Sequence, residues 1–268
     1  DVVRREMNGY ANQAAIMHAC PEGRSWCEVL EARGDKAVGK ATVFVSWALG
    51  QRVEALADAL QRWLADHPER DPAQTFFWVC DFCIRQTGGD TKADVGRLGD
   101  MVRSIGHTVL FLDPWDAPAP LLRAWCLWEI YHTVDGGAAL DVVMSAEQQA
   151  RFAAALVNDF DSITMALSKI DVHKAETREA ADKALIMGAV AASVGAQRLN
   201  EIVLERMRSW VVDAGRGALA ALPAAERATS ALLNQVAVLL QAQGRLDEAR
   251  PLYEEAVTGR RAALGDAH

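Results

Sequence analysis

Between residues 40 and 145, four short apolar runs alternate with segments of helical spacing, and this alternation restricts the fold more than any other feature. The runs lie in KATVFVSWALG (40–50), TFFWVCDF (75–82), HTVLFLD (107–113) and ALDVVMS (139–145). Their β-branched and aromatic residues are typical of strands buried on both faces. Strands that alternate with helices form a parallel sheet with helices on both faces. We therefore predict an α/β domain over 36–145.

The segments between these runs carry helical patterns. Apolar residues recur at Val53, Leu56, Leu60 and Leu64, ahead of a stop at Pro68. The other predicted elements are a Gly-rich turn at 87–90, helices over 93–106 and 121–134, and a separate N-terminal helical segment over 1–35 that is broken at CPEGRS.

In a sheet of this kind, ligands bind beyond the carboxyl ends of the strands. Ser46 and Trp47 end the first run, Asp81 lies near the end of the second, and Asp113 ends the third. We therefore expect a ligand site near these residues. No G-x-G-x-x-G follows the first run, and AVGKAT precedes a strand instead of opening a helix, so neither the dinucleotide fingerprint nor the P-loop is present.

Glu129 lies inside PLLRAWCLWEIYHT, which otherwise has the composition of a buried helix. The one cation close to it in sequence is Arg123. A carboxylate in such surroundings either points into water or has a chemical role, because burying an unpaired charge is costly. Trp125 precedes Glu129 by about one helical turn, where core packing and ligand stacking are both open.

Composition excludes several classes of partner and site. The net charge of −8 and the pI near 5.3 argue against nucleic acid, because phosphate neutralisation needs clustered Lys and Arg. No apolar run approaches the roughly 20 residues of a membrane helix, and the opening DVVRREMNGY lacks the apolar core of a signal peptide. The six histidines show no metal-ligand spacing, so we predict no metal site.

The five cysteines lie in apolar segments, which is typical of reduced thiols in a cytoplasmic protein. Cys80 and Cys83 form a C-x-x-C in a run predicted to be a strand, so we expect their side chains on opposite faces. A zinc set completed by Cys20 and Cys27 is the alternative to buried free thiols.

Beyond residue 146 only helical patterns occur, and we separate a helical region over 146–222 from a last segment over 223–268. The stretch ALLNQVAVLLQAQGRLDEARPLYEEAVTGRRAALGDAH resembles one tetratricopeptide repeat (TPR) of the kinesin-light-chain type. The resemblance implies a helical hairpin with the key positions Leu239, Gly244, Ala249, Tyr253 and Ala256, where Gly244 makes the turn. A single repeat cannot bury its own apolar face. We therefore expect the natural protein to continue past His268 as a TPR array that binds proteins. Because the sequence lacks an initiating Met, we also expect the natural protein to begin before Asp1.

The first region resembles a Toll/interleukin-1 receptor (TIR) domain over 38–145. ATVFVSWA is similar to the first-strand motif of that family, and FFWVCDF is similar to its second strand with a terminal acidic residue. HTVLFLDP and RAWCLWEI are similar to its third strand and its W-C-x-x-E helix motif. The resemblance implies a flavodoxin-like parallel sheet and self-association. In the family members that hydrolyse NAD, the glutamate of the helix motif is catalytic, and Glu129 matches it.

The two resemblances thus imply a protein of innate-immune or stress signalling that acts as an NAD nucleosidase. It would cleave the nicotinamide–ribose bond, with NAD as substrate and no cofactor, and assembly through the TPR array would switch this activity on. Such cleavage passes through an oxocarbenium-like sugar, which a nearby carboxylate stabilises. The candidate substrate-binding residues are Ser46, Trp47, Asp81 and Trp125. Many active TIR enzymes carry a basic residue just after the first-strand motif, whereas this chain has Ala48 and Leu49 there, and the nearest basic residue is Arg52.

Two further functions fit the same sequence. TIR domains also act as protein-binding scaffolds without catalysis, and Glu129 would then be structural. A nucleoside-processing enzyme of the deoxyribosyltransferase type shares a similar layout. The orientation of Glu129 separates the NAD-hydrolysing enzyme from the scaffold. A carboxylate near Ser46, Trp47 and Asp81 favours the enzyme, and one in bulk water or bound to Arg123 favours the scaffold.

Overall fold

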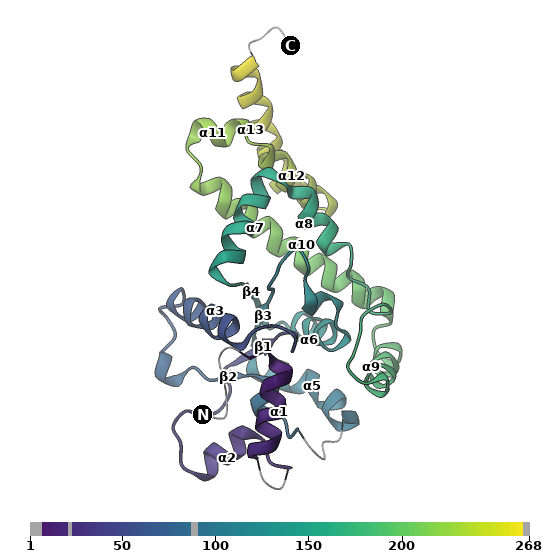
Figure 1. Ribbon diagram of the computed structural model, residues 1–268. Helices are drawn as coiled ribbons and strands as arrows, with labels where there is room; N and C mark the ends of the chain where they lie inside the picture. Colours follow the sequence, from purple (N-terminus) through teal and green to yellow (C-terminus); the bar gives the residue numbers. More distant parts are fainter. Residues whose placement is uncertain (1–6, 21–22, 87–90, 265–268) are drawn as a thin grey trace. The chain divides into compact units, whose positions relative to one another are not determined.

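The computed structural model describes residues 7–20, 23–86 and 91–264, and the predicted turn at 87–90 lies outside the described residues. The chain divides into two compact units (Figure 1). One contains the described residues up to Gln148 together with Lys169–Val203, and the other contains Gln149–Ser168 together with the described residues from Leu204 onward. Residues of the predicted helical region 146–222 are thus divided between the two units.

The first unit is built on a four-stranded parallel sheet. The strands are β1 (Val43–Ser46), β2 (Phe77–Trp78), β3 (His107–Phe111) and β4 (Ala139–Val143). Their order is β2-β1-β3-β4, and every pairing is parallel. All four residues of β1 are buried, as the continuous apolar run predicts. This sheet confirms the predicted fold class.

Helices cover both faces of the sheet. Helix α3 (Val53–Ala65) packs Leu56, Leu60 and Trp63 into one apolar cluster with the strand residues Val45 and Val109. The opposite face is covered by α5 (Thr91–Ile105) and α6 (Ala124–Asp135), which contact β1 and β3. The remaining helical elements of this unit are α1 (Gly9–Ala19), α2 (Trp26–Ala32), α4 (Cys80–Cys83), α9 (Ala180–Ala192) and two short 3-10 turns, Pro72–Gln74 and Ala119–Leu122.

The second predicted strand is much shorter than the sequence pattern suggests. Only Phe77 and Trp78 pair with β1, and the backbone then turns into α4. The amide N–H groups of Phe82 and Cys83 both donate to the Val79 carbonyl. The expectation that Cys80 and Cys83 face opposite sides of a strand is therefore wrong, because they lie three residues apart on a helical turn, where such residues are neighbours.

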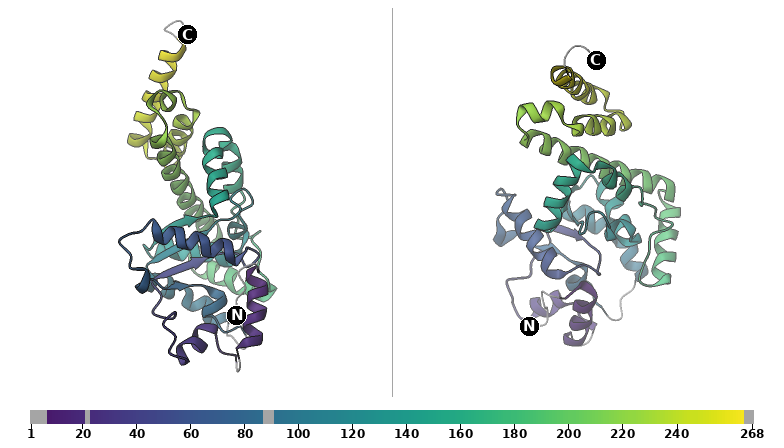
Figure 2. Two further views of the ribbon diagram at one scale, coloured as in Figure 1. Left: turned by 60° about the vertical axis from the view of Figure 1, so that its left-hand side comes forward. Right: turned by 45° about the horizontal axis from the view of Figure 1, so that its top comes forward.

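The second unit is entirely helical in its described residues. It contains α8 (Phe160–Leu167), α11 (Ala224–Thr229), α12 (Ala231–Ala242) and α13 (Leu246–Leu264), with most of α7 (Ala146–Asn158) and α10 (Ala196–Ala221). Helices α12 and α13 lie side by side and are joined by a tight turn (Figure 2). Gly244 makes this turn with φ +73°, a conformation that favours glycine.

The α12–α13 pair is the predicted TPR hairpin. Ala249 and Ala256 of α13 are buried, and α13 packs closely on α12, as the spacing of small residues predicts. Among the described helices, none is both long enough and apolar enough to cross a membrane.

Candidate functional site

The candidate site lies where β1 ends against α6. The Ser46 hydroxyl donates a hydrogen bond to Glu129 Oε2 at 2.6 Å, and Ser46 is fully buried. The two residues are 83 positions apart in sequence. Within the described residues, no ion pair joins Glu129 to Arg123. The carboxylate is thus directed at the carboxyl end of a strand, which is where ligands bind in parallel sheets.

Burial controls the electrostatics of Glu129. Loss of solvent around the carboxyl raises the pKa of Glu129 to about 7, although the hydrogen bond from Ser46 lowers it. Part of the residue remains exposed to solvent. A glutamate with such a pKa exists in both protonation states near neutral pH, and an ionisable group poised in this way is typical of functional sites.

Hydrogen bonds hold α6 in register with the sheet beside this contact. The Thr133 hydroxyl donates to the Glu129 carbonyl at 2.8 Å and also bonds the Thr108 hydroxyl of β3 at 2.8 Å. The Cys126 thiol donates to the Trp47 carbonyl at 3.4 Å. The backbone that carries Glu129 is therefore tied to both central strands, which fixes its side chain near Ser46.

Asp81 is the second buried carboxyl of this region. It lies in the first turn of α4, is fully buried, and has its pKa raised to about 7 by burial. Its Oδ1 accepts a long hydrogen bond of 3.7 Å from the Cys80 thiol. Burial raises the pKa of Cys80, and the charges of Asp81 and Glu129 raise it further. The pKa of Cys80 thus responds to both carboxyls, of which Asp81 contacts it directly.

Helix α1 lies over the loop that follows β1. The Tyr10 amide donates to the Leu49 carbonyl at 3.1 Å. A Cβ added at Gly9 would lie 2.8 Å from a ring atom of Trp47, so only glycine permits this approach. Trp47 is consequently buried, with 4% of its surface exposed.

Asn12 of α1 is a polar residue that the sequence gave no reason to single out. It is fully buried, and neither polar atom of its side chain has a hydrogen-bond partner among the described residues. Buried polar groups without a hydrogen-bond partner are rare in folded proteins, and each one calls for an explanation. The side chain of Gln13, the neighbour of Asn12, lowers the pKa of Asp81, which is consistent with the contact between α1 and α4.

The indole of Trp125 forms its hydrogen bond with α9 and not with the other candidate residues. Its indole N–H donates to Asp182 Oδ2 of α9 at 3.4 Å, and the residue is half-buried. The structure thus brings together Ser46 and Glu129, places Asp81 nearby through Cys80, and directs the polar edge of Trp125 toward α9. Sequence spacing along α6 could not reveal a partner that is 57 residues away.

Gln51 is a further residue that sequence reasoning missed. Its Oε1 accepts from the Ala48 amide at 2.8 Å, and its Nε2 donates to the Phe111 carbonyl at 3.4 Å. One buried amide therefore joins the loop after β1 to the end of β3. A glutamine just before a helix gives only a weak signal. The nearest basic residue, Arg52, is exposed and paired with Glu54 at 2.8 Å.

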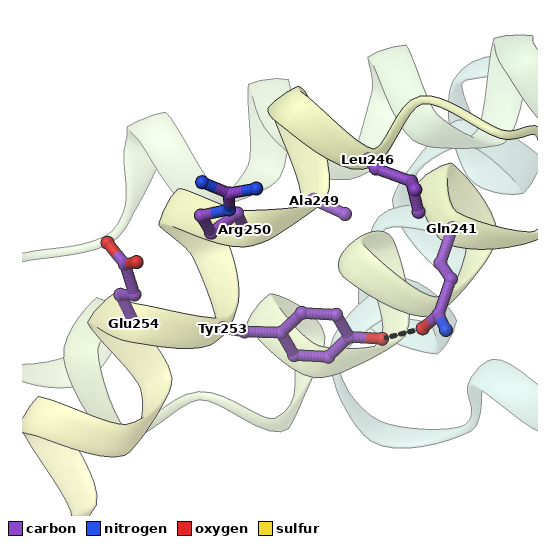
Figure 3. A pocket seen from close by; sticks show the side chains of 6 residues that line it. All are labelled: Gln241, Leu246, Ala249, Arg250, Tyr253 and Glu254. Carbon is purple, nitrogen blue, oxygen red and sulfur yellow. Dashed lines mark hydrogen bonds between the residues drawn. The ribbon is translucent and has the colours of Figure 1, made fainter.

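A shallow pocket lies on the surface of the α12–α13 hairpin (Figure 3). It is lined by Gln241, Leu246, Ala249, Arg250, Tyr253 and Glu254. The Tyr253 hydroxyl donates to Gln241 Oε1 at 2.8 Å across it, as Figure 3 shows. Leu246 is 57% exposed. Across the described residues, no group of His, Cys, Asp and Glu is arranged to hold a metal ion.

Comparison with known proteins identifies one part of the chain. The family model described as "Tetratricopeptide repeat" matches residues 229–268. No curated protein and no solved structure matches the chain. The chain therefore carries a tetratricopeptide repeat, which suggests interaction with protein partners, after a parallel α/β region that no family match identifies as TIR.

Proposed function

We propose that the α/β unit hydrolyses the nicotinamide–ribose bond of NAD, with Glu129 as the catalytic carboxylate, in a protein that engages partners through its TPR hairpin. The observation that supports this most is the 2.6 Å contact between Ser46 and Glu129 at the carboxyl end of β1. No family match identifies the α/β region as TIR, so the proposal rests on this geometry and on the TIR-like motifs.

The chemistry requires a carboxylate near the sugar. The C1′–N bond breaks, its electron pair leaves with nicotinamide as a neutral ring, and positive charge develops on the ribose. Ionised Glu129 stabilises that charge, and its low-dielectric surroundings strengthen the interaction. Water then forms the new C1′–O bond and releases one proton. Since Ser46 already donates to one oxygen of Glu129, the other oxygen remains for the ribose.

Asp81 and Trp47 are the proposed contributors to substrate binding beside Glu129. The Cys80 thiol donates a hydrogen bond to Asp81, and the charge of Glu129 raises the pKa of Cys80. A carboxyl with a pKa of about 7 can donate to or accept from a ribose hydroxyl. The Trp47 ring is covered by α1 at Gly9, so stacking a substrate ring on it requires α1 to move.

The scaffold remains the second candidate, and one observation favours it. The N-terminus of α1 packs on Trp47 and on the loop after β1, which leaves this edge of the sheet covered. A protein-binding unit needs no open pocket there. In that case Glu129 and Ser46 serve packing, and substituting Glu129 leaves partner binding unchanged.

The test is release of nicotinamide from excess NAD, followed by chromatography at high protein concentration. Wild type is compared with Glu129→Gln and with Glu147→Gln, which makes the same chemical change at an exposed glutamate of the same unit. We expect release by wild type and by Glu147→Gln, and a loss of about a hundredfold or more in Glu129→Gln.

The pH profile adds an independent readout. Because the ionised carboxylate is the active form, the rate should rise as pH increases through about 7, the pKa of Glu129. Equal release by Glu129→Gln and wild type would refute the catalytic role. The absence of release from a folded wild-type protein would favour the scaffold.

A further inference from the structure

Two cysteine thiols from distant parts of the sequence meet between α2 and α4. The Sγ atoms of Cys27 and Cys83 lie 3.6 Å apart, although the residues are 56 positions apart. Both residues are half-buried, so small oxidants can reach them. Cys27 lies in the first turn of α2, and Cys83 is the last residue of α4.

The surrounding contacts hold these two elements together. Ser25 caps α2 and exchanges hydrogen bonds with Glu28. The Glu28 carboxylate in turn accepts three hydrogen bonds from Arg85, at 2.6 to 3.1 Å, just past the end of α4. The two thiols are therefore fixed next to an ion pair that joins the same two segments.

We propose that Cys27 and Cys83 form a reversible thiol–disulfide site that peroxide oxidises, covalently linking α2 to α4. A disulfide needs its sulfur atoms about 2.05 Å apart, so the thiols must approach by about 1.5 Å. Helices α2 and α4 already contact one another, and rotation of the two cysteine side chains is the movement that the proposal requires.

The other cysteines are less suited to this reaction. Cys20 and Cys126 are buried, and Cys126 already donates to the Trp47 carbonyl. Cys80 donates to Asp81, and burial holds the pKa of Cys80 well above its usual value, which keeps it a thiol. Among the cysteines within the described residues, Cys27 and Cys83 are therefore the pair whose sulfur atoms lie close together and are accessible to peroxide.

The roles of the two sulfur atoms differ. Hydrogen bonding from Cys83 lowers the pKa of Cys27, whereas the same contact and burial raise the pKa of Cys83. Cys27 is therefore the thiolate that attacks peroxide, because the thiolate is the reactive form. Its S–O bond forms as the O–O bond breaks, and hydroxide leaves and takes up a proton to become water.

The second step closes the bond. The Cys83 sulfur attacks the sulfenic acid of Cys27, the S–O bond breaks, and a second water leaves with the Cys83 proton. In total, two thiols lose two electrons and two protons, and one peroxide becomes two waters. The new bond fixes α4, the turn that carries Asp81. This inference stands whether or not the unit hydrolyses NAD.

The experiment treats the reduced protein with hydrogen peroxide, blocks the remaining thiols and digests it with trypsin. The sequence places Cys27 on the peptide 25–33 and both Cys80 and Cys83 on the peptide 71–85. Fragmentation between Cys80 and Cys83 in the mass spectrometer then identifies the bonded sulfur. Cys27→Ser and Cys83→Ser are the test variants, and Cys20→Ser is the matched control at a buried cysteine.

We expect wild type and Cys20→Ser to lose two free thiols per chain, to yield the Cys27–Cys83 cross-link, and to recover both thiols with dithiothreitol. The thermal midpoint of the oxidised wild type should rise by several degrees, with no such rise in Cys27→Ser or Cys83→Ser. A cross-link through Cys80, links only between chains, or unchanged thiol loss in Cys27→Ser would overturn the proposal.

Discussion

At the scale of single residues, Glu129 combines two opposing influences. Burial disfavours its ionised form, and one serine hydroxyl supports that form. The apolar neighbours of Glu129 in the sequence left two possibilities open, a carboxylate that points into water and one with a chemical role. The identity of its partner could not be predicted, since Ser46 lies 83 residues away on another element.

The substitution Glu129→Gln should stabilise the protein at high pH. The folded state raises the pKa of Glu129 from 4.5 to about 7, so between these values the folded protein holds a proton that the unfolded chain releases. The stability contributed by Glu129 therefore falls as pH rises through this window. Glutamine cannot ionise, and at pH 8 it avoids a penalty on the order of 3 kcal/mol.

Urea unfolding at pH 4 and pH 8, followed by circular dichroism, measures this effect. Glu129→Gln should gain stability relative to wild type at pH 8 and show little such gain at pH 4. Glu147→Gln makes the same substitution at an exposed position and is the control. A Glu129→Gln protein whose stability relative to wild type is the same at both pH values would mean that the carboxyl is solvated.

At the scale of elements, the apolar runs predicted the positions of β1, β3 and β4 but made the second strand too long. β1, β3 and β4 lie within their predicted runs because each is flanked by a paired strand or a covering helix. β2 pairs over two residues only, although β1 continues to Ser46, because its chain turns into α4 directly after Val79. Strand-favouring residue types alone therefore do not fix where a strand ends.

A polar cluster that the sequence did not predict ties α3 to the strands. Asp141 Oδ2 accepts from the indole N–H of Trp63 at 2.7 Å and bonds His107 Nε2 at 2.8 Å. Arg70 lies 2.8 Å from His107 Nδ1. Because arginine can only donate, Nδ1 accepts, and the ring proton on Nε2 is directed at Asp141.

Asp141→Asn should destabilise the protein at neutral pH. Hydrogen bonding, first from His107, lowers the pKa of Asp141 below 3.8, so its contribution is present above that value and is lost as pH falls through the folded pKa. The side chain is 36% exposed, and solvent screening reduces the effect to about 1 kcal/mol. Urea unfolding at pH 7 and pH 3 should show the loss at pH 7 and a smaller one at pH 3. An equal loss at both values would exclude the charge as its source.

Helix packing in the TPR region depends on Gly259 of α13. A Cβ added there would overlap the backbone carbonyl of Ala228 in α11, and backbone cannot easily move aside. Gly259→Ala should therefore destabilise this unit by about 2 kcal/mol or more. Gly217→Ala in α10 is the matched control, because open space surrounds that position and alanine favours helices. Thermal unfolding followed by circular dichroism compares them, and equal midpoints for the two variants would contradict the packing argument.

At the scale of the whole molecule, neither compact unit is continuous in sequence. Helix α9 packs on α5 and α6 of the sheet unit, and Phe152 of α7 stacks on Trp210 of α10 with ring centroids 4.7 Å apart in the helical unit. Helical patterns after residue 146 predicted the helices but not these assignments. Apolar spacing in a helix does not show which unit the helix packs against, and only the tertiary contacts determine this.

Because Asp141 and Gly259 belong to different units and share no partner among the described residues, their substitutions should act independently. In the double variant, the free energies of local opening should add within about 0.5 kcal/mol. Amide hydrogen exchange with mass spectrometry measures these energies segment by segment. Faster exchange in β3 and β4 caused by Gly259→Ala alone would show that the units are energetically coupled.

The proposed chemistry depends on Glu129 being a partly buried carboxyl that ionises only near neutral pH. Carbon-13 NMR of protein labelled at the glutamate side-chain carboxyl measures this directly, with Glu129→Gln identifying the signal by its loss. The account predicts a titration midpoint near pH 7. A midpoint near 4.5, the ordinary value for glutamate, would show a solvated carboxyl and contradict the proposed role of Glu129.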